Sequence, residues 1–279
     1  MKRLGSLLIS IVLIVLLFAC TKEGRDSSYG NDNECIKTVS SFGIISEKYF
    51  YDYTGKIVEI NSVYSYKRFI YGKNGRLAKV EEALDVSTLV SSAHFSYHKN
   101  KELMTSKNST INRYRLYHYD KNGRLSKIEN YSNETGKKFE YRSMTTFEYE
   151  GVYVVKENLH DPKGKITSFH TYVYDEYGNV ANQKYYACMD NSEPELTIET
   201  SYQHDRFKNP YRIFSISESP YGGLWVNTNN IIEINSTMYK ADIARISKYS
   251  TSKTAYQYDE NGYPVKVDQG DGFNIEYAY

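Results

Sequence analysis

Short runs of alternating apolar and polar residues follow one another along most of this chain. Tyr117 and Tyr119 stand two positions apart, and residues 131–155 alternate in the same way around Gly136 and Gly151. Successive side chains of a β-strand point to opposite faces of a sheet, so such alternation places both tyrosines on one face. No long window has the 3.6-residue period of a helix. The pattern therefore predicts an all-β protein.

One unit recurs along the chain: tyrosine or phenylalanine, any residue, tyrosine, a polar turn that ends in glycine, and an apolar residue. Repetition of this kind indicates a repeat architecture. We therefore expect repeated antiparallel β-hairpins in a twisted or curled meander sheet, forming a single domain over 35–279. The clear copies lie at 49–60, 69–80, 117–128, 172–183 and 256–267, and weaker versions at 95–106, 160–169 and 202–213.

The turn inside each unit has the chemistry of a type I turn followed by a glycine bulge. Aspartate at the first position hydrogen-bonds the backbone ahead of it, and glycine at the fourth accepts a positive φ. A glycine bulge restores the twist of the two strands. We therefore assign structural turn roles to Asp52, Gly55, Gly75, Asp120, Gly123, Asp175, Gly178, Asp259 and Gly262.

The least regular segment is 209–230. Pro210 and Pro220 interrupt strand pairing there, which predicts a loop or a short helical excursion. The segment holds Trp225, the one tryptophan of the chain, and Tyr221. Loops on a rigid sheet often carry binding groups, so these two residues are the candidate ligand-binding residues.

The N-terminus has the layout of a bacterial export signal over 1–19. Lys2 and Arg3 precede an apolar run that is shorter than the ~20 residues of a membrane-spanning helix. Its end, "LFAC", resembles a lipobox, which implies a mature chain that begins at a lipidated Cys20. The alternative is an ordinary cleaved signal with a chance cysteine. Residues 20–34 are the lipidated N-terminus and a polar, flexible tether.

The net charge limits the kinds of binding partner that we expect, and the cysteine content raises the question of a disulfide. Lysine and arginine number 35 against 34 aspartates and glutamates, so no overall field favours nucleic acid as a partner. Cys35 and Cys188 would lie in an oxidising compartment, where a disulfide between them is possible. The alternative is that both are small buried hydrophobic residues. We expect a membrane contact through the lipid anchor, and a glycan or envelope protein as a possible partner.

Candidate chemistry is sparse. No nucleophile elbow, phosphate-binding loop or zinc motif occurs. His94 and His98 would lie roughly 13 Å apart along a strand, too far to share one ion. The remaining histidines, His118, His170 and His204 among them, are interpreted as exposed strand residues. We expect no metal, no cofactor and no enzymatic activity, although a hydrolase with an unrecognised carboxylate pair stays open.

Tyrosine supplies 30 of the aromatic residues, against 11 phenylalanines and 1 tryptophan. Tyrosine packs well across strands and keeps its hydroxyl in water, so a structural role is the first interpretation. Rows of tyrosine rings could also stack against sugars or peptides in a concave site.

The repeated unit resembles the YD repeat of Rhs-type and toxin-complex surface proteins. Together with "HDRFKNP" at 204–210, "NTNNIIEI" at 227–234 and the closing unit at 256–267, the chain is similar to repeat lipoproteins of gut-type diderm bacteria. The resemblance implies a β architecture and a location at the outer membrane, on its periplasmic or cell-surface face. It supplies no catalytic residue.

These observations predict a lipid-anchored, non-catalytic binding module for a glycan or a protein. The alternative is a structural or assembly protein that pairs through sheet edges. The alternating C-terminal residues Phe273, Ile275, Tyr277 and Tyr279 could either close this sheet or extend a neighbour's.

Overall fold

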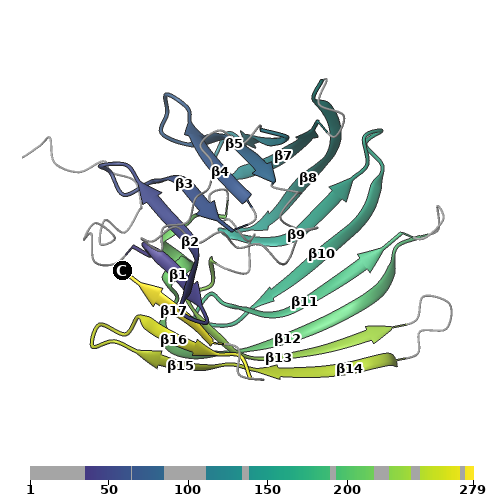
Figure 1. Cartoon of the computed structure of the whole chain (residues 1–279). Helices are drawn as coiled ribbons and strands as arrows, with labels where there is room; N and C mark the ends of the chain where they lie inside the picture. The colour runs from purple at the N-terminus through teal and green to yellow at the C-terminus, as the bar shows by residue number, and fades with distance from the viewer. Residues whose placement is uncertain are drawn as a thin grey trace, which may run out of the picture.

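The protein is described by a computed structural model, which covers residues 35–63, 65–84, 111–133, 138–188, 193–216, 226–239, 246–270 and 274–279. These residues include one 17-stranded sheet and a 3-10 turn (Figure 1). Among them, no helix has the length and apolar character needed to cross a membrane. The all-β prediction is confirmed.

The strands follow the chain in an unbroken antiparallel order. They are β1 (Thr38–Ser41), β2 (Ile44–Tyr51), β3 (Ile57–Ser62), β4 (Ser65–Tyr71), β5 (Leu77–Leu84), β6 (Arg113–Tyr119), β7 (Leu125–Ser132), β8 (Glu140–Glu150), β9 (Tyr153–His160), β10 (Ile166–Tyr174), β11 (Val180–Ala187), β12 (Glu195–Lys208), β13 (Asn229–Tyr239), β14 (Ile246–Lys253), β15 (Ala255–Tyr258), β16 (Pro264–Asp268) and β17 (Asn274–Ala278). The 3-10 turn η1 (Pro210–Ile213) lies between β12 and β13.

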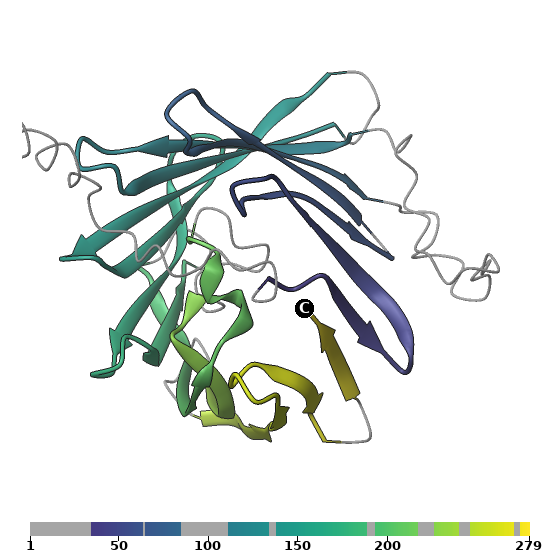
Figure 2. The same ribbon diagram turned by 90° about the vertical axis from the view of Figure 1, so that its left-hand side faces the viewer.

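The sheet curls until its two ends meet. Each strand from β1 to β14 pairs with the next, β15 to β17 do the same, and β17 pairs back to β1, with Thr38 opposite Ala278. Figure 2 shows the yellow C-terminal strand beside the purple N-terminal strands. β14 and β15 form no ladder with each other and are separated along the chain only by Thr254. The result is a nearly closed barrel, and the C-terminal strand closes this sheet.

The turns between strands have the geometry expected of their residues. Asp120 Oδ1 accepts the backbone N–H groups of Asn122 and Arg124, each at 2.9 Å. Asp52, Asp175 and Asp259 accept the equivalent pairs in their own turns. The glycines close the turns at positive φ: Gly55 +78°, Gly75 +73°, Gly123 +80°, Gly178 +81° and Gly262 +81°. These turns all lie at one end of the barrel, called the turn end below, because antiparallel strands alternate in direction.

Tyrosines tie each hairpin to the one before it. The hydroxyl of Tyr119 donates to the carbonyl of Leu77 at 2.9 Å, and that of Tyr149 donates to Leu125 at 2.7 Å. The same contact joins Tyr71 to Ile57, Tyr174 to Val154 and Tyr279 to Pro264. This network accounts for the second tyrosine in four of the five clear copies; in the fifth, Tyr258 donates to the Asp205 side chain instead.

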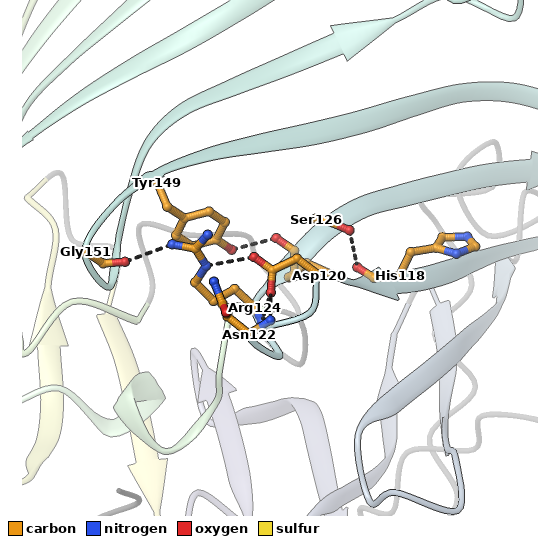
Figure 3. A network of polar contacts seen from close by, with 8 residues as sticks. His118, Asp120, Asn122, Arg124, Ser126, Tyr149 and Gly151 are labelled. Atoms are coloured by element: carbon orange, nitrogen blue, oxygen red, sulfur yellow. Dashed lines mark hydrogen bonds and ion pairs between the residues drawn. The ribbon is translucent and has the colours of Figure 1, made fainter. Parts of the chain in front are cut away.

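A cation follows three of the turn glycines, Gly55, Gly75 and Gly123, and adds to this link. Arg124 lies over the Tyr149 ring at 4.7 Å, pairs with Asp120 at 2.9 Å and donates to the Gly151 carbonyl (Figure 3). Lys56 and Arg76 lie in the same way over Tyr71 and Tyr119. Cation–π contacts of this kind contribute about 0.5–1 kcal/mol each at exposed sites.

The barrel is filled at its turn end. Pro210 opens η1, and Asn209 caps it by accepting the N–H of Tyr211. Tyr211 and Phe214 then pack against strand residues from several parts of the ring, with Phe214 stacked on Tyr49 at 6.3 Å. The cluster comprises Ile36, Val39, Tyr49, Ile57, Ile60, Phe69, Leu77, Val80, Tyr117, Leu125, Tyr211 and Phe214. The described part of 209–230 therefore closes the interior instead of lying on the surface.

Most ion pairs of the described residues lie on the outer face of the sheet, whereas Lys67 and Glu82 pair at 3.7 Å on the inner face. Ion pairs run around the ring: Arg68–Glu81, Lys127–Glu129, Lys156–Glu148, Lys184–Glu199 and Lys253–Glu233. Each pair alternates with inward residues such as Phe69, Thr200 or Ile234, so the charges share the outer face. A lysine or arginine facing lipid costs about 2–4 kcal/mol at the bilayer midplane. The outer face is therefore suited to water.

Candidate functional site

The interior of the barrel holds a cavity of about 530 Å³ between opposite parts of the ring. One wall comes from β12 and β13, with Thr200, Tyr202, Ile234 and Ser236, and the facing wall from β1, β2 and β17. The first residues of η1, from Asn209 to Tyr211, close it at the turn end. Pockets of about 300–1,000 Å³ are typical of small-molecule sites. We call this space the interior cavity.

Tyrosines and short polar side chains line the interior cavity. Tyr202, Tyr211, Tyr256 and Tyr277 contribute rings from four different elements. Burial raises the pKa of Tyr202 to about 12 and that of Tyr277 to about 12, so both hydroxyls keep their protons and can donate. Thr200 Oγ1 and Ser236 Oγ lie 3.1 Å apart in the wall. The lining combines aromatic faces with hydroxyl and amide groups and one carboxylate residue, Glu47, which accepts a hydrogen bond from Tyr49.

A hydrogen-bonded network continues from Tyr202 along the inner face. The Tyr202 hydroxyl donates to Gln183 Oε1 at 2.7 Å, and Gln183 Nε2 lies 2.6 Å from His170 Nδ1. His170 stands directly opposite Glu157 in the β9–β10 ladder. Tyr172, two positions along β10, donates to Glu157 Oε2 at 2.9 Å. We call these five residues the interior network.

The ionisable members of this network favour their neutral forms. Burial raises the pKa of Glu157, while the hydrogen bond from Tyr172 opposes that shift. Burial also lowers the pKa of His170. Desolvation penalises whichever form carries a charge, so the same cause moves an acid and a base in opposite directions. The interior wall of β9–β13 therefore presents neutral donors and acceptors.

The sequence motifs "HDRFKNP" and "NTNN" meet in a lattice of buried asparagines. Asn179 and Asn229 exchange bonds at 3.1 and 2.9 Å, and Asn227 accepts the backbone N–H of Val180 at 3.1 Å. Asn209 Nδ2 donates to the carbonyl of Asn227 at 2.9 Å. These contacts hold η1 to β11 and β13. Such bonds to buried polar groups are needed for stability, so the lattice is structural.

Some of the site residues predicted from the sequence lie in the described ranges, and others lie outside them. Cys20, Tyr221 and Trp225 lie outside the described residues. No disulfide joins Cys35 and Cys188, so that possibility is corrected. Cys35 lies at the turn end, because the Tyr51 hydroxyl bonds to Ile36, the next residue. Cys188 follows β11 at the opposite end, where its N–H donates to Thr167. The barrel's length separates the two thiols.

The interpretation of His170 as an exposed strand residue is wrong. Its ring is half-buried and bonded to Gln183, and it lies 4.8 Å from the Tyr185 ring, centroid to centroid. Sequence analysis missed Glu157, Gln183 and Tyr202 as well. They lie on separate strands, and only the pairing register places them on one face. Their inward phase within each strand is the signal that could have found them.

No family model and no curated protein matches this sequence. Among solved structures, a porin-like protein from Bacteroides vulgatus matches with a TM-score of 0.53 and 13% identity, over 88% of this chain and 98% of that chain. A porin-like protein from Bacteroides uniformis matches with a TM-score of 0.46 and 11% identity, over 87% and 96%. The match to the Bacteroides vulgatus protein shows that the two chains have a similar fold, and it carries no information about function.

Proposed function

We propose that this chain is a lipid-anchored envelope protein that binds a glycan, without catalysis, in the interior cavity. The observation that carries the proposal is the lining: four tyrosine rings with asparagine, threonine and serine groups around about 530 Å³. Sugars offer hydroxyls for neutral hydrogen bonds and C–H faces for aromatic rings. Burial disfavours the charged forms of Glu157 and His170 in the interior network, which favours an uncharged ligand there.

The location follows from the N-terminal signal and from the outer face. Lipid on Cys20 would hold the chain at the outer membrane, and residues 21–34 would form the tether. The barrel itself would stand in water beside the bilayer, because ion pairs cover its outer face. A membrane pore is disfavoured on the same ground, and also because Tyr211 and Phe214 fill the interior at the turn end.

The anchor is tested by fractionation of a Cys20→Ala variant. We expect the variant to leave the membrane fraction, whereas a Cys35→Ala variant stays in it. A Cys20→Ala protein that remains membrane-bound would refute the lipoprotein assignment.

Membership of the YD-repeat family is part of the proposal. The Asp-x-x-Gly turns and the tyrosine-to-carbonyl links give the repeated unit a mechanical role that any such array needs. Assembly through the terminal strands is less well supported, because β1 and β17 pair with each other; in the described sheet the strands that have no second ladder are β14, which pairs only with β13, and β15, which pairs only with β16.

A glycan array probed with the full chain tests the binding proposal. We expect saturable binding that is lost in Tyr202→Ala and retained in Tyr249→Ala, a matched variant at an exposed tyrosine of the outer face. Capture of an envelope protein with no glycan bound would favour assembly. Turnover of an array glycan that depends on one carboxylate, Glu157 included, would favour a hydrolase.

A further inference from the structure

Among the described strands, the ring of backbone pairing has one interruption, between β13 and β15. β13 pairs with β14 as far as Glu233 opposite Lys253, and the next contact is the Thr254 N–H donating to Ile232 at 2.9 Å. From Ala255 onward, β15 forms its ladder with β16 and not with β13. β14 and β15 lie end to end along the bottom of Figure 1. We call the gap between β13 and β15 the seam.

Two hollows meet at the seam from opposite sides of the sheet. Outside lies an open groove of about 670 Å³, lined by Asp205, Glu233, Lys253 and Tyr258 among others. Inside lies the interior cavity of about 530 Å³. Thr254 and Tyr256 line both hollows. A wall one residue thick therefore separates the groove from the cavity.

Side chains close the seam where the ladder is missing. The Tyr256 hydroxyl donates to the Ile231 carbonyl at 3.0 Å. The Tyr258 hydroxyl donates to Asp205, and the Tyr258 ring stacks on Phe207 with centroids 4.0 Å apart. A few rotamer changes would break these contacts, whereas opening any ladder elsewhere would break a series of backbone hydrogen bonds. The seam is the part of the wall that opens at least cost.

The turn end offers no comparable route. Tyr211 and Phe214 belong to the buried cluster there, at 5% and 3% exposure. The asparagine lattice also fixes η1 in place through Asn209 and Asn227.

We infer that the seam is a lateral entrance to the interior cavity, and that Tyr256 and Tyr258 are the side chains that close it. A ligand first occupies the outer groove and then passes between β13 and β15. The identity of that ligand as a glycan rests on the proposed function, but the route does not, because a chemical probe can report it without any ligand.

The rate at which a thiol reagent labels a cysteine placed in the cavity wall measures access through the seam. The full chain carries Ser236→Cys in the cavity wall, with Cys35 and Cys188 replaced by serine. A trimethylammonium methanethiosulfonate is the probe, and peptide mass spectrometry reads position 236 alone. The seam is locked by a disulfide between Glu233→Cys and Lys253→Cys, which stand directly opposite in the last rung. The matched control is a disulfide between Thr237→Cys and Tyr249→Cys in the same ladder.

The seam disulfide should slow labelling of position 236 by roughly tenfold, and the control disulfide should leave the rate unchanged, since it lies away from the opening. Tyr258→Ala should accelerate labelling relative to Tyr249→Ala. Equal rates with both disulfides would overturn the inference and assign access to the end of the barrel opposite η1. Labelling that proceeds normally without any glycan binding would refute the proposed function and leave the route intact.

Discussion

The two halves of the barrel are built from the same hairpins and are filled differently. Inside β1 to β7 the most buried inward positions are aliphatic and aromatic, and residues such as Leu77 and Val80 are 1% and 2% exposed, although an ion pair between Lys67 and Glu82 also faces inward there. Inside β9 to β13 the inward positions are Glu157, His170 and Gln183, and a cavity adjoins them. The outer face carries ion pairs in both halves.

This contrast separates what the repeated unit does from what the protein does. The turns and the tyrosine-to-carbonyl links recur in both halves, so they serve the fold. Mid-strand inward positions such as Glu157 and His170 lie outside the copies of the repeated unit, and the inward residues differ between the halves. The first half uses them for a packed core, and the second half uses them for a polar interior wall. Function is therefore expected in the second half.

The largest expected effect comes from truncating matched aliphatic residues in the two halves. Leu77→Ala removes a side chain that is 1% exposed and should lower the free energy of unfolding by about 2–5 kcal/mol. Ile234→Ala faces the existing cavity, and should cost less than about half as much, because fewer packed atoms surround it. Chemical denaturation measures both. Equal losses would mean that the two interiors are equally packed.

Turn glycines should come next. Gly123→Val forces a β-branched residue to φ +80°, which should cost about 1–3 kcal/mol, and its Cβ would also displace the Arg76 guanidinium from the Tyr119 ring. Gly164→Val has φ +86° but meets no atom within 4 Å, so it reports the backbone strain alone. Melting temperatures should fall further for Gly123→Val. An unchanged melting temperature for that variant contradicts the turn geometry.

A smaller effect should follow the loss of one tyrosine hydroxyl. Tyr119→Phe removes the donor to Leu77 and leaves a buried carbonyl without it, at a cost of about 0.5–1.5 kcal/mol. Tyr53→Phe, at a fully exposed position, is the control and should change nothing measurable. If the two variants unfold alike, the hydroxyl-to-carbonyl links do not stabilise the hairpin array.

The smallest effect is the pH dependence that Glu157 contributes in the second half. The pKa of Glu157 is raised above its ordinary 4.5, so the folded protein holds this proton to a higher pH than the unfolded chain does. Stability from this group is complete below pH 4.5 and is lost as pH rises through the folded pKa. Glu157→Gln removes that loss, so its stability relative to the wild type should rise from pH 4.5 towards neutral. If the difference in stability between Glu157→Gln and the wild type stayed constant across this range, the Glu157 carboxyl would be exposed to water and its pKa would not be raised.

Local chemistry made much of the fold predictable from the sequence. Aspartate and glycine specify their turns through hydrogen bonds within five residues, so the turn at Asp120 and Gly123 could be read directly. Closure of the ring could not, because β1 and β17 come from opposite ends of the chain. Alternation assigns Ile275 and Tyr277 to one face but does not say which strand they meet.

The candidate site was harder to predict for the same reason. Tyr202, Gln183 and His170 come from three strands, and only the pairing register of those strands brings them together. No local pattern shows that their side chains meet. The tyrosine content drew attention to stacking, yet most repeat tyrosines are committed to backbone carbonyls, and the rings left for a ligand line the cavity.

The central claim is that the inner face of the second half binds ligand and its outer face does not. Calorimetric titration with the tightest glycan from the array tests this with two tyrosines on neighbouring strands. Tyr202 bonds inward to Gln183, and Tyr239 bonds outward to Glu199. Tyr202→Phe should weaken binding by roughly 3- to 10-fold, the worth of about one hydrogen bond, and Tyr239→Phe should leave it unchanged. Weaker binding in Tyr239→Phe with none lost in Tyr202→Phe would contradict the account.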